Sequence, residues 1–267
     1  MKKYLSIFRI SFQQEFAYRL NFIMWRVRNV INILLVFFLW SSVFSDPTRV
    51  VFGYNRDKIL TYVFGILVLR AIVLSARAVD VAGEIGRGDL TNYLLKPVNY
   101  FKYWFTRDLS SKLLNIAFAV VEVTILFLIL RPPIMLQTNP LLILAFLLAL
   151  VLAIVLFFAI LFLVNMVAFW MPENGWAAQF LFIVIITEFL SGLVFPIDIL
   201  PKVLQNILYA LPFPYLVFFP LQVYLGNLGW ELILKGLLIS LSWVVLLLLA
   251  VKKIWPKGIK AYEAVGR

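Results

Sequence analysis

The chain has 267 residues, of which 64% are hydrophobic and only 14% are charged, and it contains no cysteine and no histidine. A soluble domain of this length would lack the polar surface to cover so large an apolar core, so the composition indicates a polytopic membrane protein. The missing residue types exclude disulfides, thiol nucleophiles and the common zinc sites. The net charge of +11 does not indicate nucleic-acid binding, because the basic residues lie at the ends of hydrophobic runs, where membrane topology places them.

The first 26 residues predict an amphipathic helix that lies in the membrane interface. Leu5, Phe8, Phe12 and Phe16 share one face at helical spacing, and basic and amide side chains supply the opposite face. This pattern is typical of helices that bind anionic headgroups; a helix packed on a partner protein is the alternative. We do not expect a cleavable signal peptide, because the first long apolar run follows two arginines and ends without a small-residue cleavage site.

Six hydrophobic runs follow, each near the length of about 20 residues that a helix needs to cross the hydrocarbon core. The sequence therefore predicts an all-α polytopic protein with six transmembrane helices, in which residues 1–267 form a single membrane domain. The fourth run is long enough to tilt or to protrude from the bilayer. The expected spans are residues 27–44, 59–76, 113–130, 141–170, 177–195 and 232–251.

The distribution of Lys and Arg over the connecting segments predicts that both termini are cytoplasmic. In this orientation the inner segments hold 17 basic residues and the outer segments hold six. Such an excess on one side fixes the orientation of a polytopic protein in its membrane. The inner segments are residues 1–28, 77–112, 171–176 and 252–267, and the outer segments are residues 45–58, 131–140 and 196–235.

Residues 77–112 form the only long charged interruption in the first hydrophobic half, and they predict a cytoplasmic segment that docks on another protein. The segment is too charged for hydrocarbon, yet several of its apolar residues share one side of a short helix at the 3.6-residue period. Gly86 and Gly88 allow a tight bend. Pro97 ends the helix, because the residue before a proline avoids the α region. A short exposed helix tethered to two spans is suited to transmitting force.

Residues 196–230 predict short helices rather than a span. Pro196, Pro201, Pro212 and Pro214 divide an apolar region into pieces. Each piece would be about 15 Å long as a helix, which is too short to cross the bilayer. We expect short external or re-entrant helices that cap the outer end of the bundle; a plain external hairpin is the alternative.

Two stretches resemble permease subunits of bacterial type-2 ABC exporters. The first, GEIGRGDLTNYLLKPVNYFKYW, is similar to the signature E-x-x-x-G-x-L-x-x-L-L-x-x-P, except that position 93 is Tyr. The second, residues 189–226, resembles the pattern S-G-x-x-x-P-x-x-x-x-P and the Leu-Pro-Phe segment that follows it in one bacterial subgroup. The C-terminal sequence GIKAYEAVGR also resembles the ending of that subgroup, so the likeness covers most of the chain.

The resemblance implies one transmembrane half of an ATP-driven exporter in the bacterial inner membrane, which moves its substrate outward by alternating access. In that family the loop between the second and third spans is a coupling helix seated on a separate ATP-binding subunit, which holds ATP and Mg²⁺. The helices of residues 196–225 would close the exit, and a second permease, identical or different, would complete the pathway. The docking residues implied are Glu84, Gly86, Arg87, Gly88, Leu90, Leu94 and Pro97.

Three charged residues lie inside the expected spans, namely Arg70, Glu122 and Glu188. Charges in hydrocarbon are costly, so each is a functional candidate. Arg70 and Glu122 lie at similar depths, about 18 and 14 Å from the outer edge, which predicts an ion pair that either joins two spans or lines the path. Glu188 has no evident partner, and we expect it to face a dimer interface or a wet cavity.

Two other functions would leave different signatures. An ion-coupled secondary transporter would be favoured by an inverted internal repeat, which the two halves do not show. A lipid-modifying membrane enzyme would need a catalytic constellation, but the sequence has no phosphate loop, no nucleophile elbow and no paired carboxylate cluster. We therefore expect a transport subunit rather than an enzyme, with no cofactor or metal in this chain. The substrate is not indicated.

Overall fold

The computed structural model describes residues 2–17, 19–46 and 48–262, most of which lie in helices, and none of these residues forms a strand. The predicted all-α class is confirmed. The last five residues of GIKAYEAVGR lie outside the described part of the chain. The helices are α1 (Lys2–Ala17), α2 (Arg19–Val43), α3 (Arg56–Ile72), α4 (Asp80–Gly86), α5 (Thr91–Leu94), α6 (Tyr100–Leu130), α7 (Pro140–Asn165), α8 (Gly175–Phe180), a π-helical turn η4 (Leu181–Thr187), α9 (Glu188–Leu190), α10 (Lys202–Tyr209), α11 (Phe218–Tyr224) and α12 (Trp230–Ala261).

Four of the described helices, α2, α6, α7 and α12, are long and apolar enough to cross a membrane. A fifth candidate forms if α3 and its bent continuation to Gly86 count as one span. The expected number of six is not confirmed, because two expected spans are interrupted. Helix α3 ends at Ile72, before a non-helical break, and the helical stretch that begins at Gly175 passes through η4 and ends at Leu190.

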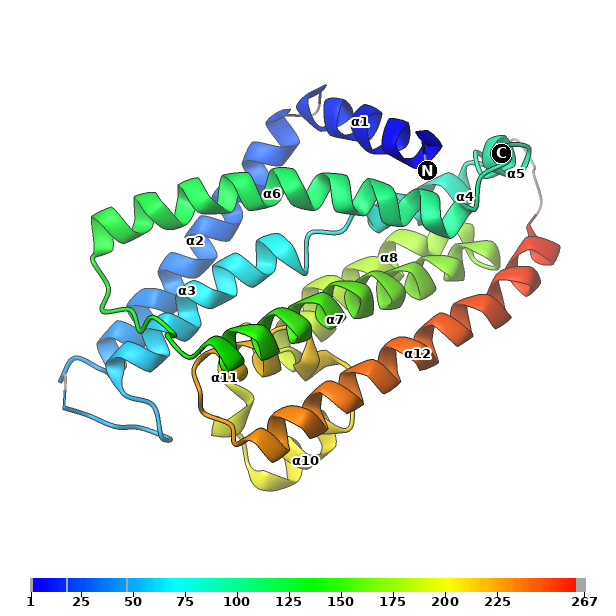
Figure 1. Ribbon diagram of the computed structural model, residues 1–267. Helices are drawn as coiled ribbons and strands as arrows, with labels where there is room; N and C mark the ends of the chain where they lie inside the picture. The colour runs from blue at the N-terminus through cyan, green and yellow to red at the C-terminus, as the bar shows by residue number, and fades with distance from the viewer. Residues whose placement is uncertain (1, 18, 47, 263–267) are drawn as a thin grey trace.

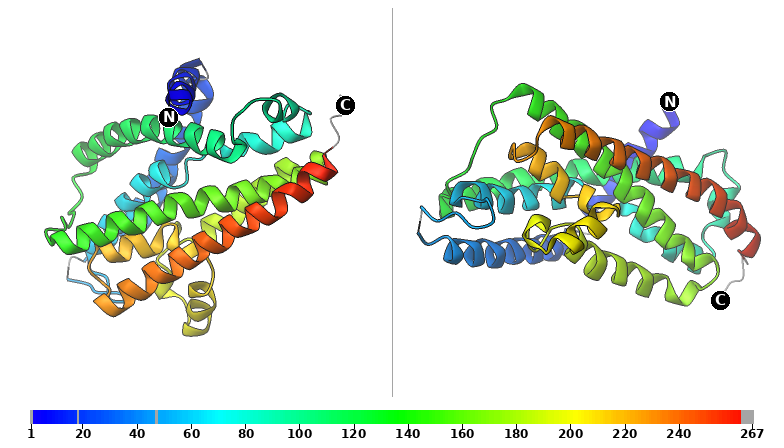
Figure 2. Two further views of the ribbon diagram at one scale, coloured as in Figure 1. Left: turned by 45° about the vertical axis from the view of Figure 1, so that its right-hand side comes forward. Right: turned by 90° about the horizontal axis from the view of Figure 1, so that it is seen from below.

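The helices form an elongated bundle in which α7 and α12 lie side by side (Figures 1 and 2). One end carries α4, α5, the first turn of α1 and the last turn of α12, and we call it the α4–α5 end; the opposite end carries α10 and α11 (Figure 1). Two contacts define the first end. Lys3 Nζ donates a hydrogen bond to Pro97 O at 2.9 Å, and the hydroxyls of Thr91 and Tyr262 lie 3.3 Å apart. The fold therefore places the basic segments that were expected to be cytoplasmic together at the α4–α5 end.

Helix α1 packs on α6, in the upper part of Figure 1. Ser110 Oγ of α6 donates a hydrogen bond to Phe8 O at 3.1 Å, and Ser11 of α1 is buried. Leu5 and Ile10 are exposed, so the described part of α1 keeps an apolar surface that α6 does not cover. The side chain of Phe16 lies outside those that the structure describes. Binding of α1 at the membrane interface stays a prediction.

Several prolines of residues 196–230 lie at the starts of short helices and turns. Proline is favoured there because it has no amide hydrogen, and the first amides of a helix have no partner within it. Pro201 precedes α10, and Pro196 and Pro212 precede 3₁₀ turns, the second of which contains Pro214. Gly192, in the Ser-Gly pattern of this region, has φ +86°. A Cβ there would lie 2.7 Å from the hydroxyl of Tyr62, so both the backbone angle and the close packing require glycine.

A polar network ties this region to the start of α3. Tyr54 Oη donates a hydrogen bond to Asp198 Oδ2 at 2.8 Å, and Gln222 Nε2 donates to the same oxygen at 3.1 Å. Lys58 Nζ extends the network by donating to Asn227 Oδ1 at 2.6 Å. These bonds hold the short helices of the α10–α11 end against α3.

Asp198 makes this network sensitive to pH. Burial raises the pKa of Asp198 above its usual value, and the hydrogen bond from Tyr54 partly opposes the rise. The contribution of this carboxyl to stability is therefore complete below its unfolded pKa of about 4 and is lost as the pH rises through its pKa in the fold. Relative to an Asp198→Asn variant, the melting temperature of the parent should fall as the pH rises through this range. Parallel melting curves of the two proteins would contradict this role of Asp198.

Candidate functional site

Residues 77–97 form a compact cap on the α4–α5 end, and we call them the docking segment. A 3₁₀ turn leads into α4, the chain bends at Gly88 with φ +80°, and α5 follows. The bend expected from the two glycines is therefore found at Gly88. The predicted cytoplasmic segment continued to residue 112, but α6 already begins at Tyr100, after the side chain of Asn99 caps it by accepting a hydrogen bond from the amide of Lys102.

Of the seven residues expected to contact a partner, Gly88 is half-buried, and the other six divide into two groups. Glu84, 7% exposed, and Leu90, 0% exposed, are buried inside the chain. Gly86, Arg87, Leu94 and Pro97 are exposed, and neighbouring Leu95, which the sequence analysis did not single out, is 82% exposed. The first group supports the docking segment from within, and the second forms its outer surface.

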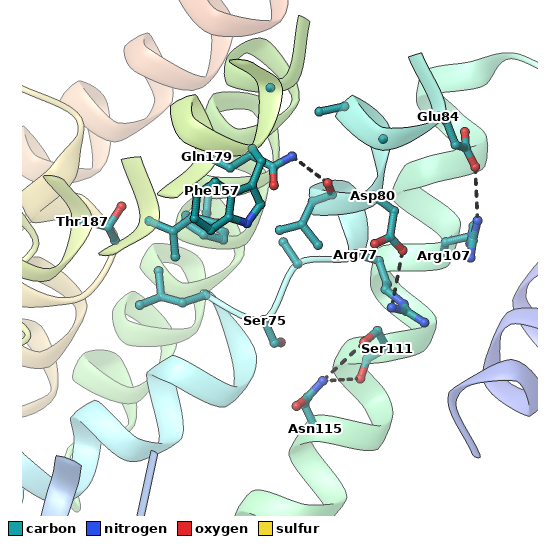
Figure 3. Close-up of a pocket in the computed structure, with 18 of the residues that line it drawn as sticks. Ser75, Arg77, Asp80, Glu84, Arg107, Ser111, Asn115, Phe157, Gln179 and Thr187 are labelled. Atoms are coloured by element: carbon teal, nitrogen blue, oxygen red, sulfur yellow. Dashed lines mark hydrogen bonds and ion pairs between the residues drawn. The ribbon is translucent and has the colours of Figure 1, made fainter. Parts of the chain in front are cut away.

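Glu84 joins α4 to the start of α6. Tyr100 Oη donates a hydrogen bond to Glu84 Oε2 at 2.8 Å, and Arg107 Nη1 lies 3.8 Å from Glu84 Oε1 (Figure 3). The guanidinium of Arg107 also lies over the ring of Trp104, 4.5 Å from its centroid. These contacts give Glu84 a supporting role, since its carboxylate is occupied within the chain.

A cavity of about 1380 Å³ lies beneath the docking segment, between α2, α3, α4, α6 and the stretch from Pro172 to Leu193 (Figure 3). Polar groups line it, including Ser111 and Asn115 of α6. Guanidinium groups and carboxylates both line it, and several of them form direct ion pairs, such as Arg77 with Asp80 at 3.4 Å. Its charged residues are Arg26, Arg28, Arg70, Arg77, Asp80, Glu84, Arg87, Arg107, Glu173 and Glu188.

The expected pairing of Arg70 with Glu122 is wrong. Arg70 donates two hydrogen bonds to Glu188, at 2.8 and 2.5 Å, and Glu122 instead accepts two from Arg26, at 2.5 and 2.6 Å. Depth along a span does not fix the direction in which a side chain points, and α9 rather than α6 supplies the carboxylate beside Arg70. Glu188, expected to have no partner in the chain, therefore has one and also lines the cavity.

The sequence analysis missed four polar residues around the break between α3 and α4, of which Asp108, Lys112 and Asn165 are buried and Gln179 is half-buried. Asp108 and Lys112 were placed in a cytoplasmic loop, but they lie on α6, inside the protein. Asn165 and Gln179 were read as part of apolar runs, and both donate hydrogen bonds to backbone oxygens of residues 77–79. The signal available in the sequence was an acidic and a basic residue, Asp108 and Lys112, four residues apart beside a hydrophobic run.

Comparison with known proteins places most of the chain in one family. Residues 30–266 match the family model described as ABC-2 family transporter protein. No curated protein matches the chain. The described residues contain no group of three or more acidic side chains positioned to hold a metal ion.

Proposed function

The chain belongs to the ABC-2 transporter family, and on this basis we propose that it is the permease subunit of an exporter driven by ATP hydrolysis on a separate protein. Members of this family are transport subunits rather than enzymes, and they generally work with an ATP-binding subunit. In this proposal ATP and Mg²⁺ bind to that partner, and this chain supplies the membrane path.

The observation that supports this function best is the outer surface of the docking segment. It combines a cation, Arg87, with apolar side chains, Leu94 and Leu95, at the tip of a segment that is internally supported by Glu84 and Leu90. An exposed apolar surface of this kind is typical of protein contacts. We assign this surface to the ATP-binding subunit, with Arg87, Leu94, Leu95 and Pro97 as contact residues and with Gly86 and Gly88 shaping the bend.

The orientation proposed is that the α4–α5 end faces the cytoplasm of a bacterial cell. The segments with 17 of the Lys and Arg residues then lie inside, as the positive-inside rule requires. The chain crosses the inner membrane six times, with α3 and the stretch from Gly175 to Leu190 as short crossings, and both termini are cytoplasmic. A second permease subunit, the same or different, completes the pathway.

The cavity is the cytoplasmic part of the proposed path. It extends from Arg87 and Glu173 near the α4–α5 end to Arg70 and Leu193, closer to the α10–α11 end. In alternating access, ATP-driven movement of the docking segment closes this side while α10 and α11 open the exit.

Two measurements on the intact protein test the function. A tagged chain purified in mild detergent should bring down an ATP-binding protein whose ATP hydrolysis vanadate inhibits. The chain has no native cysteine, so a single Asn92→Cys change can report on which side of the membrane α5 lies. A membrane-impermeant thiol reagent should label it only after the cells are opened. Labelling from outside, or purification without any ATPase, would rule out the exporter assignment.

A further inference from the structure

The break between α3 and α4 is a bend of 54° in which residues 73–76 leave the helical conformation. Val73 and Ala78 in and beside this break are completely buried. Non-helical backbone inside a membrane protein is stable only where its amide and carbonyl groups find partners within the protein. The partners of this break therefore show what holds α3 and α4 in their relative positions.

Helix α6 holds both ends of the break, Val73 and Arg77, with a buried charged pair. Lys112 Nζ, on a residue that is 3% exposed, donates hydrogen bonds to Val73 O at 3.1 Å and to Ser75 O at 2.5 Å. Asp108 Oδ1 accepts a hydrogen bond from the amide of Arg77 at 2.8 Å. The two side chains also face each other, with Lys112 Nζ 3.4 Å from Asp108 Oδ2. Hydrogen bonds from a charged donor are stronger than those between neutral groups, so Lys112 attaches the backbone of the break strongly to α6.

Two amide side chains hold the α4 side of the break. Asn165 Nδ2, at the end of α7, donates a hydrogen bond to Ala78 O at 2.9 Å. Gln179 Nε2 of α8 donates to Val79 O at 2.7 Å, as Figure 3 shows, and also to Asn165 Oδ1. Helix α6 thus holds the break from Val73 to Arg77, and α7 and α8 hold the two residues that follow it, Ala78 and Val79.

We propose that residues 73–79 are a joint that transmits movement of the docking segment to α3 and α6, with Lys112, Asp108, Asn165 and Gln179 as its positioning residues. The inference rests on the proposed function, because it takes the movement of α4 to be driven by the ATP-binding subunit. A rigid continuous helix would simply tilt. Here the four side chains fix the bend, so that movement of α4 carries α3 with it and reaches α6 directly through Lys112 and Asp108.

Electron spin resonance distances on the complete complex test this role. A pair of labels at Asn92→Cys and Lys253→Cys follows the α4–α5 end, and a pair at Asp57→Cys and Glu231→Cys follows the opposite end; all four positions are exposed. In the parent, both distances should shift when ATP and vanadate are added. In Lys112→Met, the shift at the α4–α5 end should persist, and the shift at the opposite end should fall by at least half. Lys112→Arg should restore it.

Two further variants keep the test decisive. Gln179→Leu removes both hydrogen bonds of the Gln179 amide without leaving a buried charge, and it should weaken the shift at the α10–α11 end. It tests the joint even where Lys112→Met does not assemble. Thr106→Val is the matched control, because Thr106 lies on α6 before Lys112, does not line the cavity, and donates its hydroxyl hydrogen bond to Lys102 O of the same helix; it should behave as the parent. A distant shift of parental size in Gln179→Leu and in any assembled Lys112→Met would overturn the joint. Absence of the ATPase from the parent complex would instead overturn the proposed function.

Discussion

Replacing either Arg70 or Glu188 alone by glutamine is expected to cost about 3–5 kcal/mol of the free energy of unfolding, because each change leaves a buried charge without its partner. The side chains of this pair are only 14% and 15% exposed, and two hydrogen bonds join them. Water therefore cannot fully replace the lost partner. The double replacement should be better tolerated than the sum of the two single ones, since it removes both charges together.

A double-mutant cycle measured by denaturant or thermal unfolding in detergent gives the coupling energy of the pair. We expect about 1–3 kcal/mol between Arg70 and Glu188. The control is the same cycle on Arg70 and Glu122, which should be additive within about 0.5 kcal/mol, because Glu122 is bonded to Arg26. Coupling of Arg70 to Glu122, with none to Glu188, would refute the arrangement of charges described here.

Leu95→Asp is expected to weaken association with the ATP-binding subunit by roughly 30-fold or more, the effect of losing about 2 kcal/mol at a central apolar contact. Leu95 is 82% exposed, so the change should leave the stability of the permease unaltered. Arg87→Glu should act in the same direction through charge reversal. The measurement is the amount of ATPase retained on the purified permease, together with the melting temperature of the permease alone.

Two comparisons separate contact residues from supporting residues. Val203→Asp places the same charge on an exposed position of α10, at the opposite end of the bundle, and should retain the ATPase fully. Leu90→Asp and Glu84→Ala change buried positions, so they should lower the melting temperature and association together. Equal retention of the ATPase by Leu95→Asp and Val203→Asp would remove the docking segment from the interface.

The sequence by itself determined the features that depend on local composition and period. Hydrophobicity specified an all-α membrane protein, the prolines of residues 196–230 specified short helices there, and the Lys and Arg distribution divided the chain into two groups of segments that the fold places at opposite ends. The motif around Glu84 and Gly88 indicated the family, which the match over residues 30–266 shows.

Only the tertiary structure decided which side chains meet. Helical spacing gives the depth of Arg70 and Glu122, but the rotation and crossing of the helices give their partners, which are Glu188 and Arg26. In the same way, the burial of Leu90 and the attachment of Lys112 to the break after α3 depend on contacts between segments far apart in the chain. No local pattern encodes these contacts, because each is fixed by how several helices pack at once.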